Sequence, residues 1–205
     1  MISCEIVNLQ EEKMNNSFYA MLFRMKHIKR WGIMHSLIPD YLSTHSLEVG
    51  FLAHALAMIG NDRFGKDYNC DRIAVKAIYH DVPEIFTGDI PTPVKYYSEE
   101  TKNAYSAVEA ASLQKLSDML PDEFQSEYMS LFEYTTEEKV LIKAADRISA
   151  YIKCMEEKSY GNSEFIIAGE RLLASIKEMN CVEADYFMEN FLDTFGLPID
   201  SILEK

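Results

Sequence analysis

Apolar side chains recur along most of this chain at the three- and four-residue spacing that is typical of amphipathic α-helices. No segment alternates strictly between apolar and polar residues, as a half-buried β-strand would. The predicted helices cover residues 17–28, 45–59, 70–81, 98–120, 121–132, 135–160, 163–179 and 182–195. Residues 84–86 are predicted to add one turn, and residues 90–93 to be extended. The pattern therefore predicts an all-α fold.

Polar residues at the predicted helix ends support these boundaries. Thr135 and Glu138 have the spacing of a capping box, in which each side chain bonds the backbone N–H of the other residue. Gly161 suits the position just after the same helix, where a left-handed backbone is common. The other predicted N-caps are Ser17, Ser43 or Thr44, Asn69 and Ser163.

The predicted helix 45–59 is apolar on nearly all sides, which is typical of a central, buried helix. Its polar exceptions are His45, Glu48 and His54. We expect His45 in the first turn, where a side chain can point out of the helix end into a cavity. His54 lies deep in the apolar stretch, and we expect it to be a core histidine held by hydrogen bonds.

The segment 77–93 carries the adjacent pair His80-Asp81, with Glu84 within one helical turn. Burying an imidazole and a carboxylate side by side is unfavourable unless something neutralises them, and a divalent cation does this well. Consecutive helical residues point about 100° apart, so the pair can share one ion only at a helix end. Pro83 predicts such an end. An adjacent His-Asp pair by itself also fits a salt bridge at the surface.

Two further polar residues, His45 upstream and Asp146 downstream, stand in mostly apolar helical surroundings. Asp146 and Arg147 interrupt the predicted buried stripe of the long helix, so one of them must face inward or across its edge. The stripe consists of Val140, Leu141, Ala144, Ala145, Ile148 and Ile152. In chain order, His45, His80-Asp81 and Asp146 supply two nitrogens and two carboxylates, which leave open positions on an octahedral ion for water and substrate.

A basic cluster at residues 26–30 precedes Trp31, the one tryptophan of the chain. Cations are favoured at a helix C-terminus by the macrodipole, and a lone tryptophan is usually part of a core. Arg30 and Trp31 would equally suit a site for a phosphate and a base. The two interpretations are evenly balanced on the residues alone.

Composition limits the possible classes of function. The chain of 205 residues is long enough for one domain, which we expect at 17–205 after a loosely ordered extension at 1–16. The formal net charge of −13 argues against a general nucleic-acid binder. Four scattered cysteines without a CxxC pair fit neither a zinc finger nor a disulfide framework. No leader and no membrane-spanning run is visible, so we expect a cytoplasmic protein that does not contact membranes.

Five segments form a set that is more specific than any one of them. They are Arg30-Trp31, Ser43-x-His45-Ser46-Leu47, Tyr79-His80-Asp81-x-x-Glu84, Thr87 to Tyr96 (TGDIPTPVKY) and Lys143-Ala144-Ala145-Asp146. This set resembles the YfbR-like bacterial 5′-deoxynucleotidases, which are HD-domain phosphohydrolases, and the resemblance runs from about Phe18 to Phe195. It implies a single-domain, all-α HD-domain helical bundle.

The resemblance also implies metal-dependent hydrolysis of deoxyribonucleoside 5′-monophosphates to deoxynucleoside and phosphate. Glu84 matches the catalytic carboxylate of the family. The residues that match its metal ligands are His45, His80, Asp81 and Asp146. The candidate ions are Co²⁺, Mn²⁺ and other divalent ions such as Fe²⁺, Zn²⁺ or Mg²⁺. Such enzymes are typically homodimers.

The substrate-binding residues are implied in the same way. Arg30 matches the residue that orients the phosphate during catalysis, and Trp31 matches its neighbour in the nucleotide pocket. The loop that contacts the sugar matches Asp89, Ile90, Pro91 and Thr92. The implied substrate contacts also include His45, Asp81 and Asp146.

Several alternatives remain on the sequence alone. One is another HD phosphohydrolase activity, on a triphosphate, a cyclic nucleotide or guanosine tetraphosphate. Others are a non-catalytic nucleotide-binding regulator and an interaction protein with a structural metal. The few basic residues near Arg30 favour a monophosphate, and the presence of Glu84 with all four ligands disfavours a regulator. Pro83 departs from the family pattern and can shift Glu84 relative to the metal. The physiological metal, the base preference and the pathway are not specified.

Overall fold

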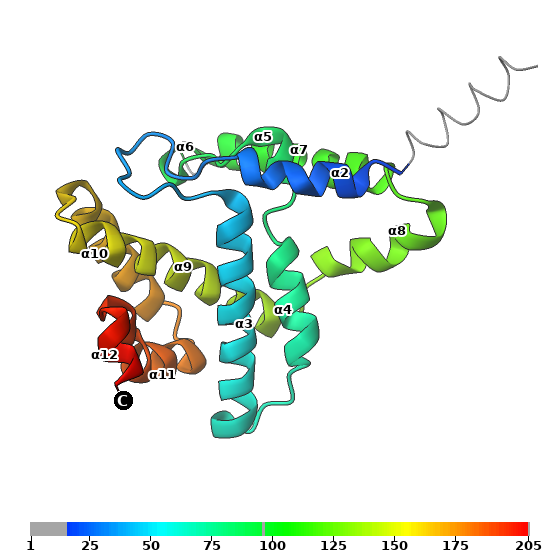
Figure 1. Ribbon diagram of the computed structural model, residues 1–205. Helices are drawn as coiled ribbons and strands as arrows, with labels where there is room; N and C mark the ends of the chain where they lie inside the picture. Colours follow the sequence, from blue (N-terminus) through cyan, green and yellow to red (C-terminus); the bar gives the residue numbers. More distant parts are fainter. Residues whose placement is uncertain (1–15, 96, 205) are drawn as a thin grey trace, which may run out of the picture. The chain divides into compact units, whose positions relative to one another are not determined.

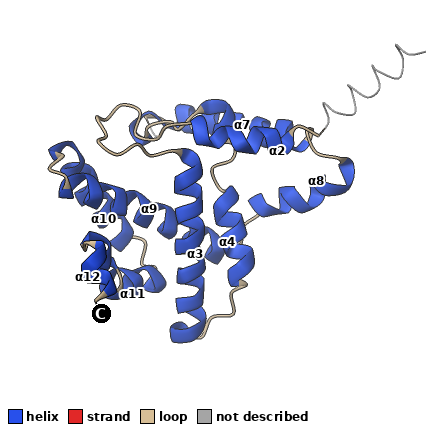
Figure 2. Ribbon diagram, viewed as in Figure 1, coloured by secondary structure: helices blue, strands red, loops and turns tan. Residues whose placement is uncertain are grey.

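The computed structural model describes residues 16–95 and 97–204, in which helices are the regular secondary structure (Figure 1, Figure 2). This part of the chain contains no strand, and an isolated antiparallel bridge pairs Lys29 with Tyr41. None of its helices combines the length and the apolar character needed to cross a membrane. Residues 1–15 of the predicted extension and Tyr96 lie outside the described residues. The all-α prediction is confirmed for the part that the structure describes.

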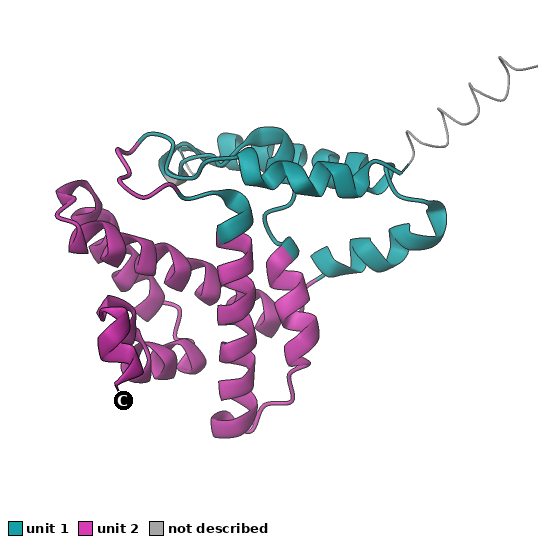
Figure 3. Ribbon diagram, viewed as in Figure 1, with its two compact units in different colours: residues 1–33, 40–44, 79–133 teal, residues 34–39, 45–78, 134–205 magenta. Residues whose placement is uncertain are grey.

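The chain forms two compact units, which Figure 3 colours separately. Unit 1 comprises the described part of residues 1–33 with 40–44 and 79–133, and unit 2 comprises 34–39, 45–78 and the described part of 134–205. Neither unit is a continuous stretch of sequence, because the chain passes between them repeatedly. Helix α3 (Leu42–Phe64) begins in unit 1 and continues in unit 2, and α4 (Cys70–Tyr79) lies in unit 2 except for its last residue.

Unit 1 consists of short helices and 3₁₀ turns (η) around one apolar cluster. Its remaining elements are α2 (Phe18–Leu22), η1 (Phe23–His27), α5 (Glu84–Thr87), α6 (Thr92–Lys95), α7 (Glu99–Ser117), α8 (Asp122–Met129) and η2 (Ser130–Phe132). The buried cluster comprises Phe18, Met25, Leu42, Val82, Leu116 and Leu120. Since Val82 belongs to this cluster, apolar burial anchors the chain immediately after His80 and Asp81.

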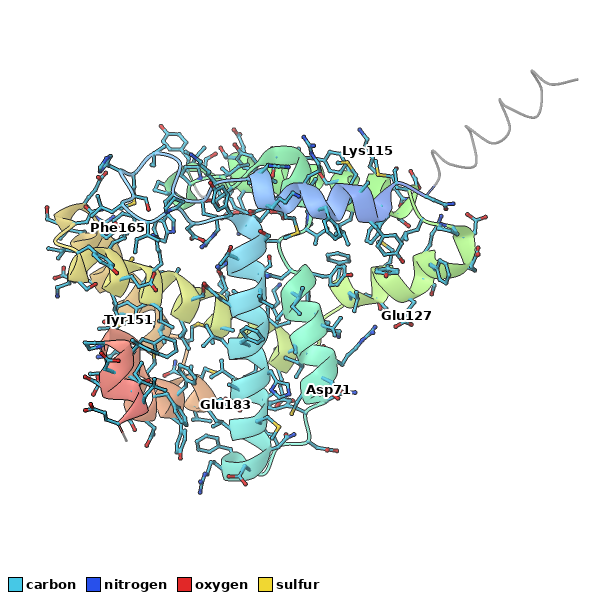
Figure 4. The ribbon with its side chains drawn as sticks, in the orientation of Figure 1. Asp71, Lys115, Glu127, Tyr151, Phe165 and Glu183 are labelled. Atoms are coloured by element: carbon cyan, nitrogen blue, oxygen red, sulfur yellow. The ribbon has the colours of Figure 1, made fainter. Side chains whose placement is uncertain are left out.

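Unit 2 packs longer helices around a second core. Its remaining elements are α9 (Thr136–Ser159), η3 (Ser163–Phe165), α10 (Ile166–Lys177), α11 (Val182–Asn190), η4 (Leu192–Gly196) and α12 (Ile199–Leu203). Helices α3 and α4 approach closely at Gly50, where an added Cβ would lie 2.6 Å from Ile78 Cγ1. Glu183, labelled in Figure 4, is buried in the first turn of α11 and accepts a hydrogen bond of 3.2 Å from the Tyr68 hydroxyl. The core includes Val49, Leu56, Ile73, Leu141, Ile148, Ile176 and Phe187.

Three of the predicted helix boundaries are confirmed by their caps. Thr135 and Glu138 form the capping box at the start of α9. The Arg72 N–H donates to the Asn69 side chain at 2.9 Å at the start of α4. Gly161 follows α9 with a φ of 83°, a left-handed conformation that glycine adopts without a Cβ clash.

The cap at Ser17 is confirmed in its position only, and the cap predicted at Ser163 is wrong. Ser17 lies at the N-cap position of α2, but its backbone is already helical and its side chain makes no capping hydrogen bond. Asn162 takes the place of Ser163, because the Asn162 side chain accepts from the Glu164 N–H at 3.2 Å. Asparagine and serine both suit an N-cap, so the side-chain type alone does not select between neighbours.

Helix α3 begins at Leu42, three residues earlier than predicted. The Leu42 N–H bonds the Ile28 carbonyl at 2.9 Å, and its side chain is fully buried in the cluster of unit 1. The helix start is therefore set by tertiary contacts. Ser43 and Thr44 lie inside the helix rather than at its cap, and His45, its fourth residue, lies in the first turn as predicted.

The prediction that α3 is buried on nearly all sides is also wrong. Leu47, Phe51 and Met58 are exposed, and Phe51 retains 68% of its accessible surface. The His54 side chain is 44% exposed, and its nearest carboxylate oxygen, on Asp71, lies 3.7 Å away. That distance is too long for a hydrogen bond, so His54 is not the core histidine that we expected.

Smaller departures concern segment ends. The predicted helix 17–28 changes to a 3₁₀ turn after Leu22, and Val140 on α9 is exposed rather than buried. Residues 90–93 are not wholly extended, because α6 begins at Thr92. Pro93 is compatible with that first helical turn, where its missing N–H would have no intrahelical partner. The predicted last helix ends at Asn190, and the short helix α12 follows.

A buried ion pair in unit 2 holds the loop at residues 36–38. Lys153 Nζ donates to Glu157 Oε1 at 2.6 Å, one helical turn apart on α9, and Glu157 is fully buried. The other donors to this carboxylate are Ser36 Oγ, the N–H groups of Leu37 and Ile38, and Asn162 Nδ2. Burial opposes the charge of Glu157, but the hydrogen bonds outweigh it and lower the pKa of this carboxyl below its ordinary value.

We expect Glu157→Gln to lower the free energy of unfolding by about 3 kcal/mol at neutral pH, because the buried Lys153 charge loses its partner. A carboxyl whose pKa is lowered by folding stabilises above its unfolded-state pKa of about 4.3, and this contribution is lost as the pH falls. The difference between the variant and the unmodified protein should therefore shrink below about pH 4. Urea unfolding at several pH values measures it, with the exposed Glu170→Gln on α10 as the control. Equal stability at neutral pH would contradict the prediction.

Candidate active site

His80 and Asp81 form the turn that leads from α4 to α5. Helix α4 ends at Tyr79, so both residues lie beyond its last turn, as Pro83 predicted. His80 Nε2 lies 3.0 Å from Asp81 Oδ2, and the side chains are 11% and 23% exposed. The His80 nitrogen and the Asp81 oxygen therefore converge at a shielded helix end. An ordinary surface ion pair would be much more exposed.

Pro83 fits the turn without distorting it. Its φ of −56° is helical, and it occupies the N-cap position of α5. Glu84 is the first residue of α5. Its N–H donates to the Asp81 carbonyl at 3.0 Å. The backbone thus brings Glu84 to the same turn as the His80-Asp81 pair.

The Glu84 carboxyl lies in an environment that disfavours its charge. Its Oε2 is buried and has no hydrogen-bond partner among the described residues. Burial is the largest cause, followed by the nearby negative charges of Asp81 and Asp89, and together they raise the pKa of Glu84 to about 9. The carboxyl is therefore protonated at neutral pH in this state, and a cation bound nearby would lower its pKa again. A carboxyl whose pKa changes in this way with nearby charge can either give or take a proton.

His45 in unit 2 has a defined orientation. It is fully buried, and its Nε2 lies 3.1 Å from Asp146 Oδ1. Its Nδ1 lies 3.1 Å from Ser149 Oγ, and Ser149 Oγ in turn donates to Glu48 Oε2 at 3.0 Å. Since the hydroxyl hydrogen is directed to Glu48, Oγ accepts from His45, whose proton is then on Nδ1. This tautomer leaves the Nε2 lone pair directed to the Asp146 side.

Asp146 and Arg147 point in different directions from α9. Asp146 faces His45, whereas Arg147 Nη1 donates to the Ser175 carbonyl at 2.7 Å. This agrees with the proposed ligand role of Asp146.

Arg30 and Trp31 in unit 1 are held by a residue that the sequence did not single out. Asp40 Oδ2 accepts from Arg30 Nη1 at 2.8 Å and from Trp31 Nε1 at 3.0 Å. Asp89 Oδ2 accepts from the Trp31 backbone N–H at 3.2 Å. Asp40 lies in a connecting loop without periodicity, so no local signal marked it. Ser149 and Glu48, which are linked to His45 by hydrogen bonds, lie on α9 and α3, and their pairing was missed because it joins residues more than a hundred positions apart.

The predicted sugar-contacting loop runs from Asp89 into α6. Ile90 and Pro91 are half-buried, and Thr92 is the first residue of α6. The structure brings Asp89 to the backbone of Trp31, and it brings together the pairs His80-Asp81 and His45-Asp146.

The donor set fits a divalent cation. Two ligands at about 2.1 Å from an ion and at right angles to each other are about 3 Å apart. The nitrogen-to-oxygen distances of 3.0 Å in His80-Asp81 and 3.1 Å in His45-Asp146 have this spacing. Each pair can therefore occupy two adjacent coordination positions.

Comparison with known proteins identifies the family. The profile described as "5′-deoxynucleotidase YfbR-like" matches residues 17–195. A 5′-deoxynucleotidase of Vibrio vulnificus is 48% identical, over 90% of this chain and 97% of that protein. The 5′-deoxynucleotidase YfbR of Escherichia coli is 46% identical, over 90% of this chain and 94% of that protein.

Solved structures agree on the fold. The HD-domain phosphohydrolase from Listeria innocua superposes with a TM-score of 0.77 at 25% identity, covering 87% of this chain and 88% of the other. The cyanophage S-2L HD phosphohydrolase DatZ, solved with dA and one catalytic Zn²⁺, gives a TM-score of 0.63 at 24% identity, covering 86% and 95%. The predicted single-domain, all-α HD-domain fold is confirmed. The chain therefore belongs to the YfbR-like 5′-deoxynucleotidase family of HD-domain phosphohydrolases.

Proposed function

We propose that this protein hydrolyses deoxyribonucleoside 5′-monophosphates to the deoxynucleoside and inorganic phosphate. The observation that carries the proposal is its match to named 5′-deoxynucleotidases over 90% of the chain, at 48% and 46% identity. The matched region contains Glu84 and the four ligand residues, which a non-catalytic regulator would not need. Arg30, which donates to Asp40, suits a substrate with one phosphate group better than a triphosphate.

The reaction requires a divalent ion, for which His45, His80 and Asp81 are proposed ligands because their ligand atoms lie within 4.8 Å of one another. Asp146, whose Oδ1 lies 3.1 Å from His45 Nε2, is the fourth proposed ligand. Two imidazole nitrogens and two carboxylates suit Mn²⁺, Co²⁺, Fe²⁺, Zn²⁺ or Mg²⁺ to different degrees. When bound, such an ion supplies the Lewis acidity that activates water and offsets phosphate charge.

In the proposed reaction Glu84 transfers a proton, and Arg30 binds the charged phosphate. In its protonated form the Glu84 carboxyl can give a proton to the leaving 5′-oxygen, and once a bound cation has lowered its pKa it can take one from the attacking water. Arg30 orients the phosphate through its planar guanidinium, which can bind two phosphate oxygens at once.

Trp31 and Asp89 select the sugar. The rigid indole excludes a 2′-hydroxyl by contact, and Asp89 accepts a hydrogen bond from the 3′-hydroxyl. Because Asp89 Oδ2 already accepts from the Trp31 N–H, the sugar contact uses Oδ1. Ile90, Pro91 and Thr92 complete the loop on the sugar side.

The protein acts in the cytoplasm as a homodimer in this proposal. The three cysteines in the described part of the chain, Cys70, Cys154 and Cys181, are free thiols, which fits a reducing compartment. Exposed apolar side chains on α3, such as Phe51, offer a surface for a second copy.

We expect Ser149→Ala to weaken Mn²⁺ binding about 10–100-fold, the usual effect of removing the group that orients a ligating histidine. Isothermal titration of the metal-free protein measures the affinity without relying on catalysis. Ser159→Ala, at the exposed end of the same helix, is the matched control. Unchanged affinity in Ser149→Ala would show that the Ser149-Glu48 chain does not orient His45.

We expect Glu84→Ala to lower kcat by about 10²–10⁴-fold with little change in metal or nucleotide affinity, because it removes a positioned acid and base. Single-turnover hydrolysis of dAMP and metal analysis of the same preparation separate the two effects. Glu100→Ala on the surface of α7 is the control. Loss of the metal from Glu84→Ala would instead make Glu84 a ligand.

We expect the unmodified, metal-loaded protein to release phosphate from dAMP faster than from AMP or from the 3′-monophosphate, with weak discrimination among bases. Rejection by a clash can exceed the about 1–3 kcal/mol that a missing methylene supplies. Trp31→Ala should then accept AMP, whereas Arg30→Ala should lower kcat/KM for every nucleotide. Comparable kcat/KM for AMP and dAMP in the unmodified protein would contradict the selection of deoxyribose.

A further inference from the structure

One oxygen of Asp40 holds two neighbouring side chains that point to it from the same segment. Arg30 Nη1 lies 2.8 Å and Trp31 Nε1 lies 3.0 Å from Asp40 Oδ2. A guanidinium and an indole N–H can only donate, so a carboxylate is the side chain best suited to receive both. All three residues belong to unit 1.

The contact is shielded from water. The side chains of Arg30 and Asp40 are 11% and 10% exposed, so the ion pair is screened far less than one at the surface. The Arg30 guanidinium also lies 5.8 Å from the centre of the Trp31 ring. Cation, ring and carboxylate therefore form one compact group.

The backbone around this group is also held by Asp40. The Arg30 N–H bonds the Asp40 carbonyl at 3.0 Å, next to the bridge between Lys29 and Tyr41. Trp31 has a φ of 61°, in the left-handed region that side chains other than glycine rarely adopt. Such a conformation persists only when surrounding contacts impose it. Its N–H is bound by Asp89, and its indole is bound by Asp40.

We propose that Asp40 is a positioning residue that sets the phosphate contact of Arg30 and the sugar contact of Trp31 together. This inference rests on the proposed function for what the two residues do, but not for how they are held. Without the Asp40 carboxylate, the Arg30 guanidinium can rotate and the Trp31 indole can leave its place. The left-handed backbone of Trp31 then loses one of the contacts that hold it. Catalytic rate and sugar selection should therefore change in the same variant.

The first test uses Trp31 as its own probe, since it is the single tryptophan of the chain. We expect the emission of Asp40→Ala to shift to longer wavelength and its quenching by acrylamide to increase. Asp67→Asn, in the exposed loop between α3 and α4, should match the unmodified protein. This measurement needs no substrate, so it remains decisive even if dAMP is not hydrolysed.

The second test compares kcat/KM for dAMP and AMP in the metal-loaded protein. In Asp40→Ala we expect kcat/KM for dAMP to fall about 10–100-fold, the effect of losing a charge-assisted hydrogen bond. The ratio of dAMP to AMP should also fall toward that of Trp31→Ala. A structural role alone would lower the active fraction and leave this ratio unchanged. Asp40→Glu, which keeps the carboxylate, should recover more of the ratio than Asp40→Asn.

The proposal is overturned if a folded Asp40→Ala or Asp40→Asn, checked by circular dichroism, keeps both the emission of Trp31 and the dAMP-to-AMP ratio. It is also overturned if Asp40→Glu is no better than Asp40→Asn. If Asp40→Ala does not fold, the nearly isosteric Asp40→Asn decides. Failure of the unmodified protein to hydrolyse dAMP would overturn the proposed function, and the fluorescence result would still decide the role of Asp40.

Discussion

Buried carboxylates paired with nearby donors hold the local structure of two segments outside the helices of this protein. Removing a charge from water is costly, and a carboxylate that accepts several hydrogen bonds recovers most of that cost. Glu157 holds the loop at residues 36–38, and Asp40 holds Arg30 and Trp31. The Leu37 and Ile38 N–H groups and the Arg30 and Trp31 side chains that donate to these carboxylates belong to segments outside the helices. The acidic side chain therefore supplies the order that secondary structure does not.

Glu84 is the contrasting case. Its carboxyl is buried beside Asp81 and Asp89, and no donor reaches its Oε2 among the described residues. The result is a pKa near 9, far above that of an ordinary glutamate. Such a group is suited to proton transfer because small changes in nearby charge alter its protonation. Pro83 and the turn after α4 place Glu84 at the first position of α5, five residues beyond the last residue of α4.

The elements with a strong local signal were predicted well. The capping box of Thr135 and Glu138, the glycine at 161 and the helix end before His80 depend on residues within a few positions of one another. The start of α3 was not predicted, because it depends on the contact between Leu42 and Ile28. The exposure of His54 was not predicted either, because it depends on how much of the helix surface other elements cover. Helix propensity and periodicity do not contain that information.

The sequence by itself determined the all-α fold, which follows from periodicity, and it indicated the family and the candidate ligands through the resemblance of five segments to that family. Only the tertiary structure decided which atoms face each other. The hydrogen bonds from His45 to Ser149 and from Ser149 to Glu48 each join residues more than a hundred positions apart, and the bond from Trp31 to Asp89 spans 58. Such partners are chosen by the packing of helices against each other, which depends on the whole set of buried side chains and not on any local pattern.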